Sequence, residues 1–238
     1  MGTSRYLSRN GLAAAAIGVA MLAGTAACGG GGSGSAGPLA GLTGDQIANK
    51  AIAGLKAASS VHFAGTIAES GATYIVNMNA GTTKCTGTLG IQGKGSFALL
   101  KTGQTIWIKP DNLFWTSNGA TSAVLAVVGG KWIQSTASDS NLTSVAELCS
   151  PAQIADSFGS KLNEVVKGAT STVDGQSALL LKDTKDSSSA YVTVSAAPEF
   201  VRLDGGSSGH LDFSDYNAPV NVSAPPASQT LQGSKIGF

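Results

Sequence analysis

The clearest chemical signal in the sequence is a cysteine that closes an N-terminal export signal. Arg5 and Arg9 precede an apolar run from Gly11 to Ala23, and small residues then lead to Cys28. A charged region, an apolar region and a short zone of small residues, in that order, are typical of a secretory signal peptide. The apolar run is too short, and too rich in alanine and glycine, for a good membrane-spanning helix.

The residues around the predicted cleavage point indicate lipidation of the cysteine. The ending Ala26-Ala27-Cys28 resembles a bacterial lipobox, although Thr25 stands where leucine is commonest. In a lipobox the cysteine thiol is diacylglycerylated and the signal is cut just before it, so we expect palmitate-type acyl chains on Cys28. The alternative is an ordinary secretory signal with a chance cysteine. The Gly/Ser-rich residues 29–37 favour the lipoprotein, because such sequence is a flexible spacer.

These segments divide the chain into three parts. We expect a signal peptide over residues 1–27, a tether over 28–41 and one folded domain over 42–238. The domain is long enough for one substantial core and short for two. Stable anchoring needs more than one acyl chain, which a lipidated cysteine supplies. The protein is therefore expected at the cell membrane, on the extracytoplasmic face of the bacterial envelope.

Composition argues against several classes of partner. Charged residues make up only 12% of the sequence. The signal carries two of the 15 basic residues and no acid, which leaves 13 basic and 14 acidic residues and a net charge of about −1. Nucleic acid is not expected as a partner, because the sequence has no basic patch. We expect a monomer that uses no cofactor.

Cys85 and Cys149 remain once Cys28 is assigned to the lipid. In an exported protein a disulfide is the default interpretation of two such cysteines. The alternatives, a redox pair or metal ligands, would need C-x-x-C spacing or nearby histidines, which this sequence lacks. Closing a loop of this length would constrain the unfolded chain by about 4 kcal/mol.

The sequence carries no recognisable catalytic motif. It contains neither a G-x-S-x-G nucleophile elbow nor an H-E-x-x-H metal motif. Its two histidines, His62 and His210, are expected to be solvated or packed rather than to act as general bases. We therefore expect a protein that is not an enzyme and holds no metal.

One amphipathic helix is predicted to pack on a larger sheet. Thr43 and Gln46 form a capping-box signature, and apolar residues then recur at helical spacing as far as Ser59 or Ser60. Short alternating runs with turn signals every eight to twelve residues predict antiparallel strands. These strands cover residues 61–68, 73–78, 84–92, 96–101, 105–109, 113–116, 169–173, 177–182, 191–194, 200–204 and 211–213. Helices are expected over 122–128, 144–148 and 151–166, and an extended segment beyond 216.

This order of segments resembles a known group of proteins. The second run of strands contains Asp174-Gly175-Gln176, Tyr191-Val192-Thr193-Val194, Phe200-Val201-Arg202-Leu203 and Leu211-Asp212-Phe213-Ser214-Asp215-Tyr216. With the cysteine, tether, helix, meander and helical insert before it, the stretch 42–225 resembles the LolA-like superfamily, and most closely the actinobacterial LppX/LprAFG-type lipoproteins. The resemblance implies an α+β fold, in which a strongly bent antiparallel half-barrel sheet has helices covering its concave face.

The same resemblance implies an apolar cavity for acyl chains between sheet and helices. Apolar residues that alternate along the predicted strands are the candidates to line it: Phe63, Ile67, Val76, Met78, Phe97, Leu99, Ile106, Ile108, Phe114, Leu180, Val192 and Phe200. Any sheet covered by helices needs such a face in order to fold. Because large pockets are also mostly apolar, a filled core and a hollow one have the same sequence pattern.

Three functions remain under consideration. The first is a lipid-anchored protein that binds or carries an acylated ligand, namely a lipid, glycolipid or lipoprotein. The second is a structural or interaction lipoprotein with a closed core, which would act through its outer face and expose Trp107 or Trp115. The third, and the least supported, is an exported hydrolase with a polar constellation in a cleft. We expect the first.

Overall fold

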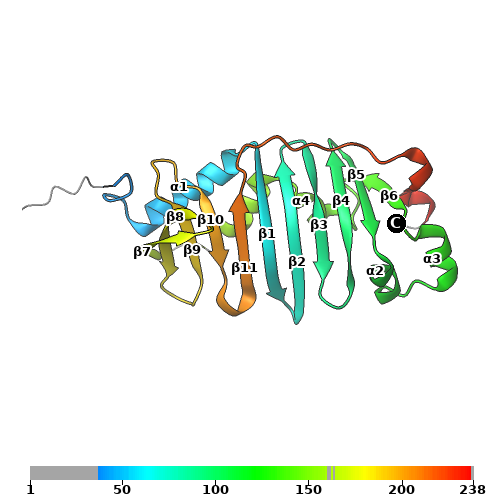
Figure 1. The fold of residues 1–238 in the computed structure, drawn as a ribbon, viewed down its shortest axis with the longest axis horizontal. Helices are drawn as coiled ribbons and strands as arrows, with labels where there is room; N and C mark the ends of the chain where they lie inside the picture. Colours follow the sequence, from blue (N-terminus) through cyan, green and yellow to red (C-terminus); the bar gives the residue numbers. More distant parts are fainter. Residues whose placement is uncertain (1–36, 160–161, 163, 237–238) are drawn as a thin grey trace, which may run out of the picture. The chain divides into compact units, whose positions relative to one another are not determined.

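A single open sheet organises the folded part of the chain. The computed structural model describes residues 37–159, 162 and 164–236. Twelve strands lie in the order β12-β6-β5-β4-β3-β2-β1-β11-β10-β9-β8-β7. Since β12 and β7 stand at the two edges, the sheet is not closed, and with its helices it forms the expected α+β half-barrel (Figure 1). The predicted signal peptide, Cys28 and the tether up to residue 36 lie outside the described residues.

The elements follow one another in an order close to the prediction. Helix α1 and five strands come first: α1 (Gly44–Ala57), β1 (Ser60–Glu69), β2 (Ala72–Gly81), β3 (Lys84–Ile91), β4 (Gly95–Thr102) and β5 (Thr105–Pro110). The middle contains α2 (Asn112–Ser117), α3 (Ser122–Val128), β6 (Trp132–Thr136), α4 (Thr143–Glu147) and α5 (Pro151–Gly159). The last group is β7 (Val165–Val173), β8 (Gln176–Asp183), β9 (Ser189–Thr193), β10 (Phe200–Asp204), β11 (Gly209–Ser214) and β12 (Thr230–Gln232), with short 3₁₀ turns.

The C-terminal segment adds a parallel strand pair to the sheet. After β11 the chain crosses over the ends of the strands and adds β12 beside β6 (Figure 1). Strand β12 pairs with β6 in parallel, whereas all the other described pairs are antiparallel. The expected antiparallel sheet thus has one parallel pair at this edge, because the Pro-rich crossing returns the chain in the same direction as β6.

Helix α1 forms as its sequence predicts. The Thr43 hydroxyl accepts a hydrogen bond from the Gln46 backbone N–H, and the Gln46 side chain accepts one from the Thr43 backbone N–H. This reciprocal capping box satisfies N–H groups that have no partner within the helix. The helix buries Ile47, Ala51 and Leu55 against the sheet.

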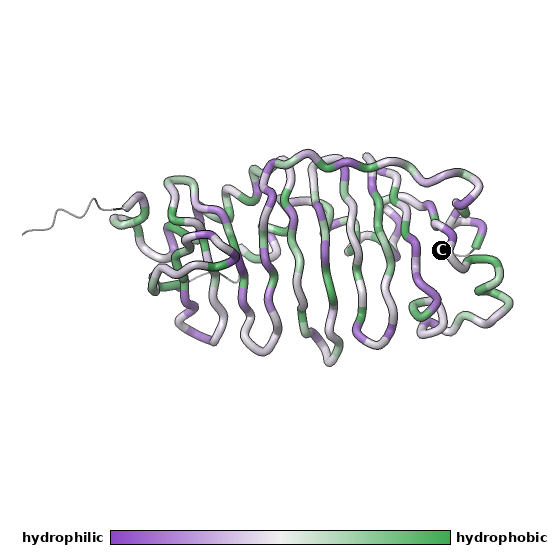
Figure 2. The backbone as a smooth tube through the Cα atoms, viewed as in Figure 1, coloured by the Kyte–Doolittle hydropathy of each residue, from purple (hydrophilic) through white to green (hydrophobic). Residues whose placement is uncertain are grey.

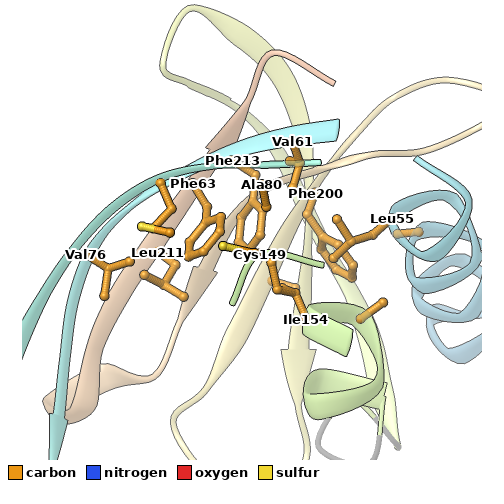
Figure 3. Packing of buried hydrophobic residues seen from close by; sticks show 14 of the residues in the cluster. Leu55, Val61, Phe63, Val76, Ala80, Cys149, Ile154, Phe200, Leu211 and Phe213 are labelled. Carbon is orange, nitrogen blue, oxygen red and sulfur yellow. The ribbon is translucent and has the colours of Figure 1, made fainter. Parts of the chain in front are cut away.

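The core lies between the sheet and the helices α1 and α5. Figure 3 shows Phe63, Phe213 and Phe200 from the sheet meeting Leu55 of α1 and Ile154 of α5. The ring of Phe213 lies 6.2 Å from the rings of both Phe63 and Phe200. Along most strands, hydrophobic and hydrophilic residues alternate (Figure 2), which leaves one face of the sheet for this core.

The predicted disulfide is present. Cys85 of β3 and Cys149, which follows α4, are bonded with their Cα atoms 5.3 Å apart. Both residues belong to the core cluster. The bond therefore joins the α4–α5 segment directly to the sheet. At the start of the described residues Leu39 is also buried in this cluster.

The predicted helix over 151–166 ends earlier, at Gly159, and the chain is extended again from Val165. The Val165 N–H donates to the Asp45 carboxylate at the start of α1, with the two atoms 2.8 Å apart. Val165 and Val166 are β-branched and favour a strand. Within the described ranges, no helix is long and apolar enough to span a membrane.

Candidate functional site

One face of the sheet carries a continuous row of apolar residues. We call this the inner face, defined as the face that packs against α1 and α5. Directly opposite residues on neighbouring strands share a face. Across eight strands the row is Phe213, Phe63, Met78, Gly87, Leu99, Ile108, Ile133 and Leu231. The first three side chains named, with Leu99, Ile108 and Ile133, are at most 3% exposed, so this central row is a packed core.

Gly87 has a specific place in the central row. A Cβ on Gly87 would lie 2.5 Å from the sulfur of Met78 and would also clash with the Asn77 carbonyl. The Met78 side chain therefore occupies the space that a side chain on Gly87 would need. This is the reason for a glycine in the middle of a strand that is otherwise half-buried.

Toward one end of the strands the inner face becomes less buried. The next two rows pair Val76 with Leu89 and Phe97, and Ile67 with Tyr74 and Ile91. Val76 is buried, but the other five are only half-buried. We call Ile67, Tyr74, Leu89, Ile91 and Phe97 the half-buried band. An incompletely covered apolar strip that continues a core is a surface on which an apolar ligand can bind.

The structure brings most of the predicted lining residues to the inner face. Ten of the twelve belong to the core cluster or pack against it: Phe63, Ile67, Val76, Met78, Phe97, Leu99, Ile106, Ile108, Val192 and Phe200. Phe114 lies beside them, because its ring packs edge-to-face on the Phe97 ring with centroids 5.5 Å apart. Contact of these eleven residues with a ligand stays a prediction.

Leu180 does not lie with the others. Leu179 and Leu181 enter the core cluster. Leu180 between them faces outward, where it pairs with Tyr191 and packs against Gly168. Its assignment to the cavity was wrong because three leucines in succession show no alternation, and alternation is the only local guide to which face a residue takes.

The segment expected as a strand over 113–116 is the short helix α2. Asp111 caps it, since one carboxylate oxygen accepts from the Phe114 N–H at 2.6 Å. The other oxygen accepts from the N–H and the hydroxyl of Ser96, each at 2.9 Å. Burial raises the pKa of Asp111, but these hydrogen bonds outweigh it and hold the pKa below 3.8. Asp111 thus ties the start of α2 to β4.

Sequence reasoning missed the residues that complete this end of the inner face. Tyr74, Leu89 and Ile91 stand in step with Val76 and Met78 across the sheet. The alternation along each strand could have predicted that these residues share the inner face, although Gly87 interrupts the apolar pattern of β3. Trp115 of α2 also packs against the core cluster. The position of Trp115 could not be inferred, because residues 113–116 were predicted to be a strand.

A hollow on this part of the molecule differs from the expected apolar cavity. It is an open depression of about 750 Å³, and Thr88, Ser96, Ala98, Lys109 and Leu125 are among its lining residues. Thr88, Ala98 and Lys109 pair side by side on the outer face, since they alternate with inner residues such as Leu99 and Ile108. This depression therefore lies on the opposite side of the sheet from the predicted lining.

A polar chain on the outer face involves one of the two histidines. His62 Nδ1 lies 3.0 Å from the Ser214 hydroxyl oxygen, and its Nε2 lies 3.1 Å from the Asn77 side-chain oxygen. The same hydroxyl donates to the Asp215 carboxylate at 3.2 Å. Neither the depression nor a smaller hollow of about 170 Å³ beside Asn217 includes His62 or Ser214. The contacts join β2, β1 and β11 and hold the histidine between polar neighbours.

Comparison with known proteins agrees with the architecture. LprF from Mycobacterium bovis matches with a TM-score of 0.51, over 76% of this chain and 96% of that one. The chain has the LppX/LprAFG-type fold. The two sequences are 16% identical, so the likeness to LprF is one of fold. An uncharacterized conserved protein from Thermus thermophilus is 10% identical with a TM-score of 0.32, over 78% of this chain and 96% of that one.

The sequence comparisons add no family assignment. No protein-family model matches the chain, and no curated protein matches its sequence.

Proposed function

We propose that this chain is an exported, membrane-anchored lipoprotein that binds or carries an acylated ligand against the inner face. The observation that carries the proposal is the half-buried band. It is an apolar strip, continuous with the packed central row, on a fold shared with the lipoprotein LprF. The envelope setting rests on the predicted export signal and on Cys28.

The packed central row determines how a ligand would be held. Leu99 and Ile108 are already buried by their neighbours, with 1% and 2% of their surface exposed. An acyl chain would therefore lie over the band, between the sheet and α2, rather than fill a preformed space in the centre. Each buried methylene contributes about 0.8 kcal/mol. Immobilising the chain offsets part of this gain.

Native mass spectrometry of the chain with Cys28→Ala, exported to a periplasm and purified without detergent, tests the binding proposal. We expect co-purifying acylated species at near-stoichiometric occupancy. Leu89→Arg should abolish that occupancy, because it places a charge in the band. Ile75→Arg is the matched control. Ile75 lies on the adjacent strand, is 49% exposed and faces outward, so occupancy should be retained.

A clean apo mass, with no uptake of phosphatidylethanolamine or monopalmitoylglycerol from added vesicles, would contradict the binding proposal. Equal loss of occupancy in both arginine variants would also contradict the assignment to the band. Circular dichroism of each variant separates loss of the site from loss of the fold.

The anchor requires its own test. Wild-type chain expressed in an envelope with lipoprotein processing should partition into the detergent phase of a Triton X-114 separation, and Cys28→Ser should partition into the aqueous phase. Detergent partition of the Cys28→Ser protein would show that the association does not depend on acylation of this residue.

A second candidate function is binding of another protein through the outer surface. Leu113 of α2 and Val124 and Val127 of α3 are 52%, 42% and 58% exposed. No charged residue occurs over 112–130, and Figure 2 shows α3 as a hydrophobic stretch. The two tryptophans expected on such a surface are not exposed, since Trp107 is buried and Trp115 is half-buried. An apo mass in the experiment above would favour this function.

A further inference from the structure

Trp115 carries a buried hydrogen-bond donor that has no partner. Among the described residues, its indole Nε1 is the one side-chain nitrogen or oxygen that is buried without an acceptor or donor. An indole nitrogen is a donor only. Leaving such a group unpaired is costly, so an orphaned donor in a folded protein calls for an explanation.

The other side of the sheet offers a direct contrast. Trp107 lies on β5 on the outer face, and its Nε1 donates to the side-chain oxygen of Gln134 at 3.3 Å. Trp107 is also buried, at 8% exposure. The sheet thus satisfies one buried indole with a side chain from the neighbouring strand, whereas Trp115 has none.

The surroundings of Trp115 are those of an apolar ligand site. The residue packs against the core cluster. Its ring meets the Phe114 ring edge-to-face at 6.3 Å, and Phe114 in turn meets Phe97 of the half-buried band at 5.5 Å. The Trp115 ring is therefore linked through Phe114 to the end of the inner face that carries the half-buried band.

We propose that Trp115 Nε1 donates a hydrogen bond to the ester carbonyl oxygen of an acylated ligand whose chain lies over the half-buried band. This inference rests on the proposed function. A neutral carbonyl fits better than a phosphate, because an anion taken into apolar surroundings loses its hydration at a much higher cost. The indole would thus fix the position of the ester while the acyl chain contacts Phe97 and Leu89.

The attachment of α2 allows a ligand to reach the donor. The helix has six residues, and none of them is fully buried. It is held at its start by the Asp111 cap and along its length by the packing of Phe114 and Trp115. We therefore expect α2 to shift when a ligand reaches the indole nitrogen, and the ligand to replace the apolar contacts that are lost.

The test compares two ligands that differ in one carbonyl group. Monopalmitoylglycerol carries the ester, and 1-O-hexadecylglycerol has the same chain length and head group without the carbonyl. For the chain with Cys28→Ala, we expect the ester to bind about 3- to 10-fold more tightly than the ether, the range of one net hydrogen bond. Trp115→Phe should reduce this ratio to about one. Trp107→Phe, which removes an indole that already has a partner, should leave the ratio unchanged.

A spectroscopic measurement covers the case in which Trp115→Phe fails to fold. The three tryptophans should give three indole N–H signals in an ¹⁵N–¹H correlation spectrum of the Cys28→Ala chain. We expect the ester to move one of these signals downfield and the ether to leave it in place. Single Trp107→Phe and Trp132→Phe variants assign that signal by elimination.

The outcomes separate this inference from the function on which it rests. Binding of ester and ether with equal affinity would overturn the role of Trp115 and leave the acyl-binding proposal intact. If folded Trp115→Phe still prefers the ester, the role of Trp115 is likewise overturned and the acyl-binding proposal is kept. If neither ligand binds to the wild-type site, both proposals are wrong.

Discussion

Removal of the Cys85–Cys149 disulfide should cost a large part of the stability of the folded domain. The bonded residues are 64 positions apart. On the chain-entropy model, opening a loop of this length costs about 4 kcal/mol of unfolding free energy. Domains are typically stable by about 5–15 kcal/mol, so the loss is a large share of the total. The loss of stability should be greatest in α4, a five-residue helix whose start has no side-chain cap.

Urea unfolding of the Cys28→Ala chain, followed by circular dichroism, measures this loss. With a slope of about 2 kcal/mol per molar urea, the midpoint should fall by about 2 M in the Cys85→Ala/Cys149→Ala double variant. Reduction of the parent protein with dithiothreitol should give a similar midpoint, because it opens the same loop without removing the sulfur atoms. A loss below about 1 kcal/mol in both would refute the argument that the bond constrains this loop.

Two further predictions concern Asp111 and Gly87. Asp111→Ala should cost about 1 kcal/mol in unfolding free energy through loss of the α2 cap. Because the folded pKa of Asp111 lies below 3.8, the ionised cap stabilises the fold above that pH and its contribution disappears as the pH falls through the folded pKa. Asp111→Asn should retain a cap and lose this part of the acid dependence, which parallel urea titrations at pH 3 and pH 6 measure. Gly87→Val should cost about 1–3 kcal/mol, because its side chain would clash with the Asn77 carbonyl and overpack against Met78. Gly41→Ala, whose Cβ meets nothing within 4 Å, is its control, and equal thermal midpoints for the two variants would contradict the packing argument.

Much of the fold follows from local patterns. The capping box at Thr43 predicted the start of α1, and alternation predicted most strands of the meander. In β5 this alternation places Ile106 and Ile108 in the core cluster, while Trp107 between them bonds across the outer face. These features depend on residues close in the sequence, which is why the sequence alone could specify them.

The candidate site could be predicted only in part. Eleven of the twelve expected lining residues reach the inner side, because each stands in an alternating run or beside one. The assignment of Leu180 to the lining was wrong because its neighbours in the sequence are equally apolar. The form of the site was not predictable. The packed central row and the half-buried band differ in what covers them, and coverage depends on where α1, α2 and α5 dock.

The sequence by itself determined the order of the elements, the cysteine pair and the alternation that separates the two faces. Only the tertiary structure decided that the start of the helix over 112–117 is tied to β4, through the hydrogen bonds between Asp111 and Ser96. It also decided that residues 230–232 join the sheet in parallel and that the Trp115 indole is buried without a partner. The physical reason is the same in each case. Hydrogen bonds and burial between distant residues exist only once the chain has brought them together, and local propensity carries no information about them.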